Sequence, residues 1–282
     1  MKSYFNTVFC IVLLMLNTST YAAERIISAG GAVTELIYAL GASSQLVAVD
    51  VTSVMPAEDK LPSVGYHRQL SAEGILSLSP TMLIGSEEMG PYSTLKLLKQ
   101  ANLPVHIINS EATVTGLLQR VDQLAELTHE EANSKKLKQG IKQQVTALQA
   151  TQPKQKKRIL FLMMHEGRPA NVAGANTTAN TVIELIGGVN PAAEHLESYK
   201  PLAQESLIEM QPDVILISQR SYQKFKNKEA ILLAFPMLAG TPAGKNKALY
   251  SIDGKALIGG LGLKSLQESS RLKQIIYSQK SL

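Results

Sequence analysis

Residues 70–80 read LSAEGILSLSP, and residues 202–212 read LAQESLIEMQP. In each stretch a glutamate, Glu73 or Glu205, lies seven residues before a proline, and a short apolar run follows the proline. A pattern that returns in the second half of a chain indicates a repeated structural unit. The repeat therefore predicts two similar lobes.

Strand-like and helix-like segments alternate around these two stretches. Residues 25–29 form a short apolar run that ends at Gly30 and Gly31, where backbone can approach a ligand closely. A helical pattern of apolar residues follows and closes at Gly41. Such alternation is typical of parallel sheets covered by helices on both faces. We therefore expect an α/β fold of two Rossmann-like lobes with parallel sheets.

The middle of the chain interrupts this alternation. Residues 113–150 are dominated by helix-forming residues and contain no proline. Their apolar spacing predicts one helix followed by a long amphipathic helix that joins the lobes as a spine. A cleft between two lobes is a common ligand site, so we expect the ligand there. A helical spine should allow only modest opening of the cleft.

The first residues have the order of a secretory signal. A positive charge at Lys2 precedes the apolar run 8–16, and small residues lead to cleavage after Ala22 or Ala23. Nine apolar residues are too few to span a bilayer, which takes about 20. We therefore predict export without membrane insertion. The chain then divides into a signal peptide (1–22), an N-terminal lobe (23–125), a connecting helix (126–152) and a C-terminal lobe (153–282).

Charge and cysteine content limit the kinds of partner and of covalent bond that we expect. The net charge of +5 arises from 28 Lys and Arg against 23 Asp and Glu, and the excess is spread along the chain. The densest basic run, residues 154–158, is more typical of a solvated linker than of a binding patch. No nucleic-acid partner is therefore expected. The one cysteine, Cys10, lies in the signal, so the exported chain needs no disulfide.

Two segments carry a resemblance to a known family. Residues 30–41, GGAVTELIYALG, and residues 64–80, VGYHRQLSAEGILSLSP, resemble helical-backbone substrate-binding proteins of iron-chelate and cobalamin importers. Within them the chain is most similar to the periplasmic haem-binding proteins of Gram-negative bacteria. The likeness covers nearly the whole exported chain, and its specific part is Gly-Tyr-x-Arg-x-Leu-Ser-Ala-Glu-Gly. It implies a monomeric periplasmic protein that is not an enzyme and carries ferric haem b.

The resemblance implies that Tyr66 ligates the haem iron. A phenolate is an anionic oxygen donor that suits ferric iron, and its usual pKa of about 10 requires iron or a nearby cation to stabilise it. Arg68, two residues on in a segment expected to be extended, should point to the same side. It could favour the phenolate or pair with a haem propionate. The same geometry would turn His67 to the opposite face, towards solvent or the rim of the site.

Further candidates lie across the expected cleft. His165 follows the apolar run 159–163, at the counterpart of the Gly30–Gly31 turn, and some members of the haem-binding family use a histidine there as the second iron ligand. Relatives often carry Pro and Arg in the glycine-rich loop, where Lys264 stands here. A propionate contact from Lys264 would be a point charge, not an arginine fork. We also expect Gly30 and Gly31 to contact haem.

The repeated glutamates imply a second role. In the family, one such glutamate on each lobe meets arginines of the inner-membrane permease, which works with an ATPase. Glu73 and Glu205 are thus predicted to form a docking surface that aligns the two proteins mainly through charge.

Several alternatives remain open. The same fold could hold cobalamin or a ferric siderophore, although siderophore binders tend to use several Arg and Trp and this chain has no Trp. A manganese or zinc binder would need three or four converging His and carboxylate ligands. A secreted hydrolase could use a serine with His165, but no Gly-x-Ser-x-Gly turn is present. A sensor or chaperone built on the same lobes is a further alternative.

Overall fold

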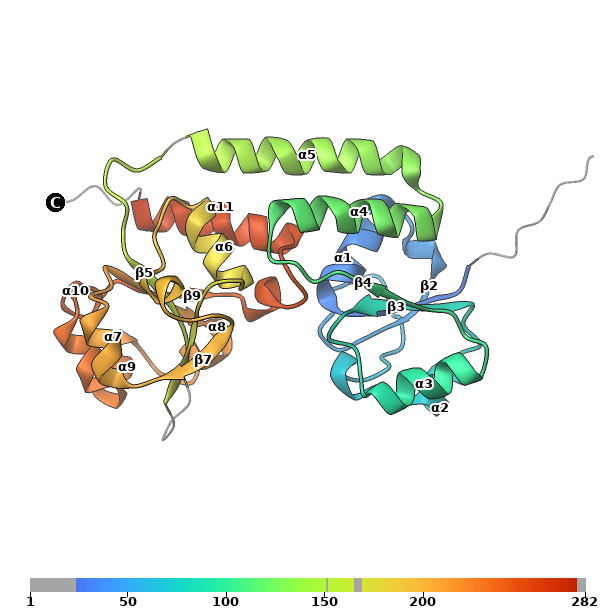
Figure 1. The fold of residues 1–282 in the computed structure, drawn as a ribbon, viewed down its shortest axis with the longest axis horizontal. Helices are drawn as coiled ribbons and strands as arrows, with labels where there is room; N and C mark the ends of the chain where they lie inside the picture. The colour runs from blue at the N-terminus through green and yellow to red at the C-terminus, as the bar shows by residue number, and fades with distance from the viewer. Residues whose placement is uncertain (1–23, 151, 165–168, 278–282) are drawn as a thin grey trace, which may run out of the picture.

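Two α/β lobes lie side by side beneath one long helix (Figure 1). The structure is a computed structural model and describes residues 24–150, 152–164 and 169–277. The predicted signal peptide and His165 fall outside these residues. The predicted α/β class with two lobes is confirmed.

The N-lobe is built on a four-stranded parallel sheet with the order β2-β1-β3-β4. The central strands β1 and β3 pair in register, with Ile26 opposite Met82 and Ala29 opposite Gly85. Their side chains are almost entirely buried because helices cover both faces. The strands are β1 (Ile26–Ala29), β2 (Leu46–Val49), β3 (Met82–Ser86) and β4 (Val105–Ile108).

Local sequence signals set the ends of the N-lobe helices. Ser71 and Thr113 accept hydrogen bonds from the backbone N–H groups of Gly74 and Gly116, and so cap α2 and α4. Gly41 ends α1 in the left-handed conformation. One core cluster joins α1 and α4 to the sheet, and another lies beneath α2 and α3. The helices are α1 (Gly31–Leu40), α2 (Ala72–Leu76), α3 (Tyr92–Gln100) and α4 (Val114–Thr128), with 3-10 turns η1 (Ser43–Gln45) and η2 (His67–Gln69).

The C-lobe sheet departs from the expected parallel arrangement. Its order is β7-β6-β5-β8-β9, and β6 and β7 run antiparallel to their neighbours. Only residues 164–169 separate β5 from β6, which is too short for the crossover that a parallel pair needs. The strands are β5 (Ile159–Met163), β6 (Ala170–Ala173), β7 (Tyr199–Leu202), β8 (Val214–Ser218) and β9 (Leu249–Ile252).

Helices cover both faces of this second sheet. One core cluster joins the sheet to α6 and α11, and another joins it to the shorter helices. The helices are α6 (Thr178–Leu185), α7 (Gln204–Glu209), α8 (Gln219–Tyr222), α9 (Lys228–Ala234), α10 (Pro242–Lys245) and α11 (Leu263–Tyr277), with 3-10 turns η3 (Pro191–Glu194), η4 (Pro236–Gly240) and η5 (Gly254–Leu257).

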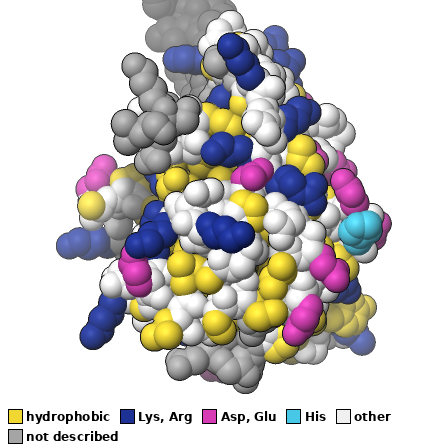
Figure 2. Space-filling view, turned by 90° about the vertical axis from the view of Figure 1, so that its left-hand side faces the viewer, with side chains coloured by type: hydrophobic (Ala, Val, Ile, Leu, Met, Phe, Trp, Pro, Cys, Tyr) yellow, Lys and Arg dark blue, Asp and Glu magenta, His cyan; other side chains and the backbone are white. Residues whose placement is uncertain are grey.

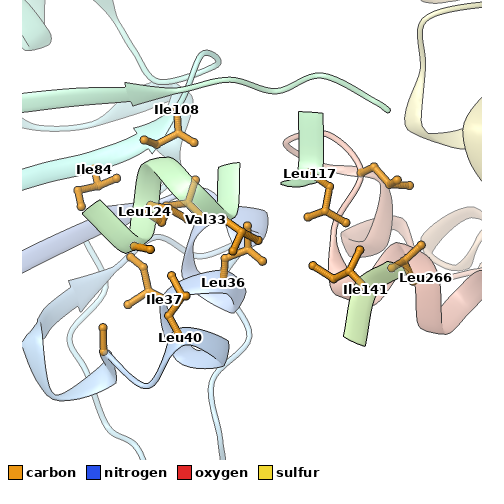
Figure 3. Close-up of a cluster of buried hydrophobic side chains, with 14 of the residues drawn as sticks. Val33, Leu36, Ile37, Leu40, Ile84, Ile108, Leu117, Leu124, Ile141 and Leu266 are labelled. Atoms are coloured by element: carbon orange, nitrogen blue, oxygen red, sulfur yellow. The ribbon is translucent and has the colours of Figure 1, made fainter. Parts of the chain in front are cut away.

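The predicted long amphipathic helix is α5 (Glu131–Ala150), which spans both lobes (Figure 1). It does not join them alone, because α11 packs against α1, α5 and α6. The N-lobe core continues into these helices: Figure 3 shows Ile141 of α5 and Leu266 of α11 beside Leu117 of α4. Two helices and a shared core thus resist separation of the lobes. The boundaries drawn at residues 125 and 152 stay a prediction.

In the part of the chain that the structure describes, no helix is long and apolar enough to cross a membrane.

Candidate functional site

Tyr66 lies where the carboxyl ends of the N-lobe strands meet. It directly precedes η2, and its side chain is 39% exposed, so the phenol is not packed away inside the lobe. The backbone N–H of Val51 donates to the carbonyl oxygen of Gly65 at 2.9 Å, which brings the loop after β2 beside it. Val51 and Val54 are 55% and 49% exposed. An accessible phenol therefore stands near exposed apolar side chains at the edge of the sheet.

His67 does not face solvent or the rim, as the extended geometry predicted. Its side chain is fully buried, with Nδ1 3.0 Å from Oδ2 of Asp50 and Nε2 3.4 Å from Oε2 of Glu88. The prediction was wrong because residues 67–69 form a 3-10 turn and not a strand. The imidazole lies edge-on to the Tyr66 ring, with centroids 4.6 Å apart and planes at 64°. The buried histidine thus supports the residue that carries the exposed phenol.

The buried carboxylate of Asp50 fixes this turn through hydrogen bonds. Its carboxylate accepts hydrogen bonds from the backbone N–H groups of Gly30 and Thr52 and from the hydroxyls of Thr52 and Ser53, at 2.6–3.1 Å. Burial would raise the pKa of Asp50, but hydrogen bonds from His67 and these groups hold it at about 2. The carboxylate therefore stays charged and ties the loops after β1 and β2 to the turn after Tyr66.

The same hydrogen bonds set the charge states of His67 and Glu88. Burial would lower the pKa of His67, but hydrogen bonds with Asp50 and Glu88 and their negative charges raise it to about 9. The hydrogen bond with His67 is the main cause that lowers the pKa of Glu88 to about 2. Burial opposes this change, and the hydrogen bond with Arg68 adds to it. An imidazolium thus lies between two carboxylates behind Tyr66.

Arg68 lies close to Tyr66, although not through the extended geometry that was expected. Its Nη2 lies 2.5 Å from Oε1 of Glu88, and about half of the side chain is exposed. The hydrogen bond to Glu88 raises the pKa of Arg68 despite partial burial, and the negative charge of Glu88 adds to the rise. The guanidinium is therefore held by an ion pair with Glu88, on the turn that directly follows Tyr66.

The structure also brings Gly31 and Lys264 together. Both line a small pocket at the seam between the lobes, with Thr52 and Glu35. The backbone N–H of Gly31 donates to Oγ1 of Thr52 at 3.1 Å, and a side chain at Gly31 would meet the Thr52 carbonyl oxygen. The Lys264 ammonium pairs with Asp253 at 2.6 Å. These contacts hold both residues within the protein, and their contact with a ligand stays a prediction.

Glu35 was not identified from the sequence, and it joins the lobes beside this pocket. Its carboxylate accepts hydrogen bonds from the backbone N–H groups of Leu263 and Lys264, at 2.7 and 3.2 Å, at the start of α11. Negative charge is stabilised at a helix N-terminus. A side chain at Gly262 would lie 2.0 Å from Oε1 of Glu35, so the close approach requires glycine there. The first turn of α11 is thus fastened to α1.

This contact predicts a pH dependence. Burial raises the pKa of Glu35 to about 7, against the hydrogen bonds from Lys264 and Leu263 and the positive charges of Lys264 and Arg120. The folded protein binds this proton more tightly than the unfolded chain does, where the pKa is 4.5. The stability from protonated Glu35 is therefore full below pH 4.5 and lost as pH rises through about 7.

We expect the free energy of unfolding of wild type, relative to Glu35→Gln, to fall as pH rises, by up to about 1.4 kcal/mol per pH unit in this window. Urea unfolding of both proteins at about pH 5 and about pH 8 measures the change. The same difference at both values would contradict the assignment.

Three predicted residues remain: two glutamates on exposed helix starts, and a histidine that is not among the described residues. Glu73 and Glu205 are exposed in the first turns of α2 and α7, one on each lobe. His165 is not among the described residues. Within the described ranges, no group of three His, Cys, Asp or Glu side chains could hold a metal ion.

A family model described as periplasmic binding protein matches residues 26–256. The chain belongs to this family. A periplasmic binding protein is a transport component, and the family places this chain in the periplasm. Among solved structures, it is similar to the periplasmic heme-binding protein HutB of Vibrio cholerae, with 57% identity over 91% of this chain and 100% of that chain and a TM-score of 0.87.

Other relatives are described as binding heme or vitamin B12. The heme-binding protein RhuT of Roseiflexus sp. RS-1, solved in apo form, is 32% identical over 91% of this periplasmic binding protein and 98% of RhuT, with a TM-score of 0.82. A vitamin B12-binding protein of Vibrio parahaemolyticus is 28% identical over 199 residues, which cover 70% of this chain and 72% of that protein.

Proposed function

We propose that this periplasmic binding protein captures ferric haem b in the cleft between its lobes and delivers it to the permease and ATPase of an importer. The exposed phenol of Tyr66 carries the proposal, because it stands at the strand ends on a turn fixed by buried charges. The likeness to a heme-binding protein at 57% identity supports it.

The surroundings suit each part of haem. Tyr66 would supply a phenolate to ferric iron. The exposed Val51 and Val54 offer apolar surface to the porphyrin, whose faces avoid water. Arg68 would pair with a propionate, exchanging or sharing its contact with Glu88. His165 would approach from the C-lobe as second iron ligand, with Gly30, Gly31 and Lys264 as further contacts.

A titration of the purified, exported chain with hemin tests this function. We expect a tyrosinate–haem absorption spectrum that saturates at a fixed ratio of hemin to protein. Cobalamin is the second candidate, since the curated relatives include vitamin B12-binding proteins. A parallel titration with cyanocobalamin separates the two. Saturable binding of cyanocobalamin with no change in the hemin spectrum would replace haem by cobalamin.

The two exposed glutamates define the second half of the proposal. Glu73 and Glu205 occupy equivalent first turns in the two lobes, where they can meet cations of the permease. We expect Glu73→Arg with Glu205→Arg to bind hemin as wild type does but to support less than about a tenth of wild-type uptake, because like charges across an interface cost several kcal/mol. Uptake into vesicles containing the importer measures this. Normal uptake would reject the docking role.

A further inference from the structure

The exposed large apolar side chains of the described residues fall into three groups. Val51, Val54 and Tyr66 belong to the candidate site. Four lie on α2, α3 and β4 of the N-lobe: Leu76, Tyr92, Leu97 and Ile107. Two lie on α9 and η4 of the C-lobe: Leu233 and Met237. Tyr92 and Leu233 are the most exposed of the nine, at 81% and 84%. Each lobe thus shows one almost fully exposed large apolar side chain.

On the N-lobe, the helix start that carries this side chain is held against the segment that leads to Glu73. The backbone N–H of Leu70 donates to the carbonyl oxygen of Gly90 at 2.8 Å, and the hydroxyl of Thr94 donates to the carbonyl oxygen of Leu70 at 3.0 Å. These bonds hold the start of α3 against the segment that leads into α2. Tyr92 is the first residue of α3, and Glu73 lies in the first turn of α2. An exposed ring and an exposed carboxylate therefore share one surface.

The C-lobe repeats the combination with different elements. Both α7, which carries Glu205, and α9, which carries Leu233, pack against η4. The helices α2, α3, α7 and α9 all lie on the side of the molecule away from α5 (Figure 1). Figure 2 views the C-lobe end, where hydrophobic side chains are exposed over the lower half, towards α7 and α9, among charged side chains of both signs.

We propose that Tyr92 and Leu233 are apolar anchors that hold this protein on the importer permease, while Glu73 and Glu205 steer the approach. The proposal rests on the proposed function. Exposed aromatic and aliphatic side chains contribute most once a partner removes them from water. The partner should therefore offer two similar surfaces, each with an apolar pocket beside a cation. An anionic lipid surface fits less well, because the two glutamates would be repelled by it.

Binding kinetics separate anchors from steering charges. Changes of rim charge alter mainly the association rate and its salt dependence, whereas changes of buried apolar contacts alter mainly the dissociation rate. We expect Tyr92→Ser with Leu233→Ser to raise the dissociation rate from the importer in nanodiscs about tenfold or more. Its association rate should stay near wild type. Glu73→Gln with Glu205→Gln should instead lower the association rate and flatten its salt dependence.

Matched controls separate a loss of permease contact from a loss of folding or of hemin binding. Tyr92→Phe retains the ring and should dissociate as wild type does. Hemin titration and the unfolding temperature should be unchanged in the Ser variant, because both side chains are exposed.

An unchanged dissociation rate in the Ser variant would overturn the anchors, and the Glu variant would still test the docking role. A dimer in sedimentation that the Ser variant loses, with normal importer binding, would assign this surface to a second copy. Failure of wild type to bind hemin would instead overturn the proposed function.

Discussion

Tyr66→Phe should weaken ferric haem binding by about 100-fold or more. Groups outside the coordination sphere already change metal affinity by 10–100-fold, and this change removes the proposed ligand atom itself. The ring remains, so its edge contact with His67 should persist. The side chain is 39% exposed and its hydroxyl has no hydrogen-bond role in the buried network, so the fold should be retained. Hemin titration followed by absorbance gives both the affinity and the loss of the tyrosinate–iron band.

Two companions make this result specific. His165→Ala should weaken binding far less than Tyr66→Phe, because the phenolate supplies the main bond to ferric iron. Glu88→Gln should leave the phenol in place but remove the negative charge that pairs with Arg68 and His67. It therefore tests how much that charge contributes to hemin binding. Equal hemin affinity in Tyr66→Phe and wild type would remove Tyr66 from the site.

Much of the fold could be predicted from patterns within the sequence. The two LxxE stretches predicted paired lobes, and the proline-free middle predicted α5, because both signals lie in local spacing. The antiparallel β6 and β7 were missed. Strand direction depends on the connection between strands, and the link between β5 and β6 is too short for a parallel pair.

The site was predicted less completely. Tyr66 and Arg68 were chosen as candidates through the family motif, and their roles stay predictions. The buried position of His67 depends on a single 3-10 turn, which an expected extended segment would not show. Asp50 directly follows the apolar strand β2, and this position at a strand end could have marked it. Glu35 and Arg120 carry no local signal. Their roles arise from contacts with residues 261–264, far away in the sequence.

Arg120 leads to the second large expected effect. Its side chain is fully buried, and its guanidinium donates to the carbonyl oxygens of Asn109, at 2.8 Å, and Glu111, at 3.3 Å. It also donates to the carbonyl oxygen of Leu261 in the opposite lobe. Burial lowers the pKa of Arg120 to about 10, against the charges of Glu35 and of Glu111 and Glu87. One cation thus satisfies carbonyl groups from both lobes.

We expect Arg120→Met to reduce the free energy of unfolding by about 3–5 kcal/mol. Methionine fills much of the volume but leaves the carbonyl oxygens of Asn109, Glu111 and Leu261 without their donor, and an unpaired buried polar group is costly. Urea unfolding measures the loss. Arg271→Met is the matched control, because Arg271 is 42% exposed in its ion pair with Glu268 and should cost at most about 1 kcal/mol.

The comparison also tests how the lobes are coupled. If Arg120 holds them together, Arg120→Met should lower the unfolding midpoint far more than Arg271→Met does. Similar losses in Arg120→Met and Arg271→Met would show that the buried guanidinium adds nothing beyond an ordinary surface pair. The seam would then depend on the shared apolar core of α1, α4, α5 and α11.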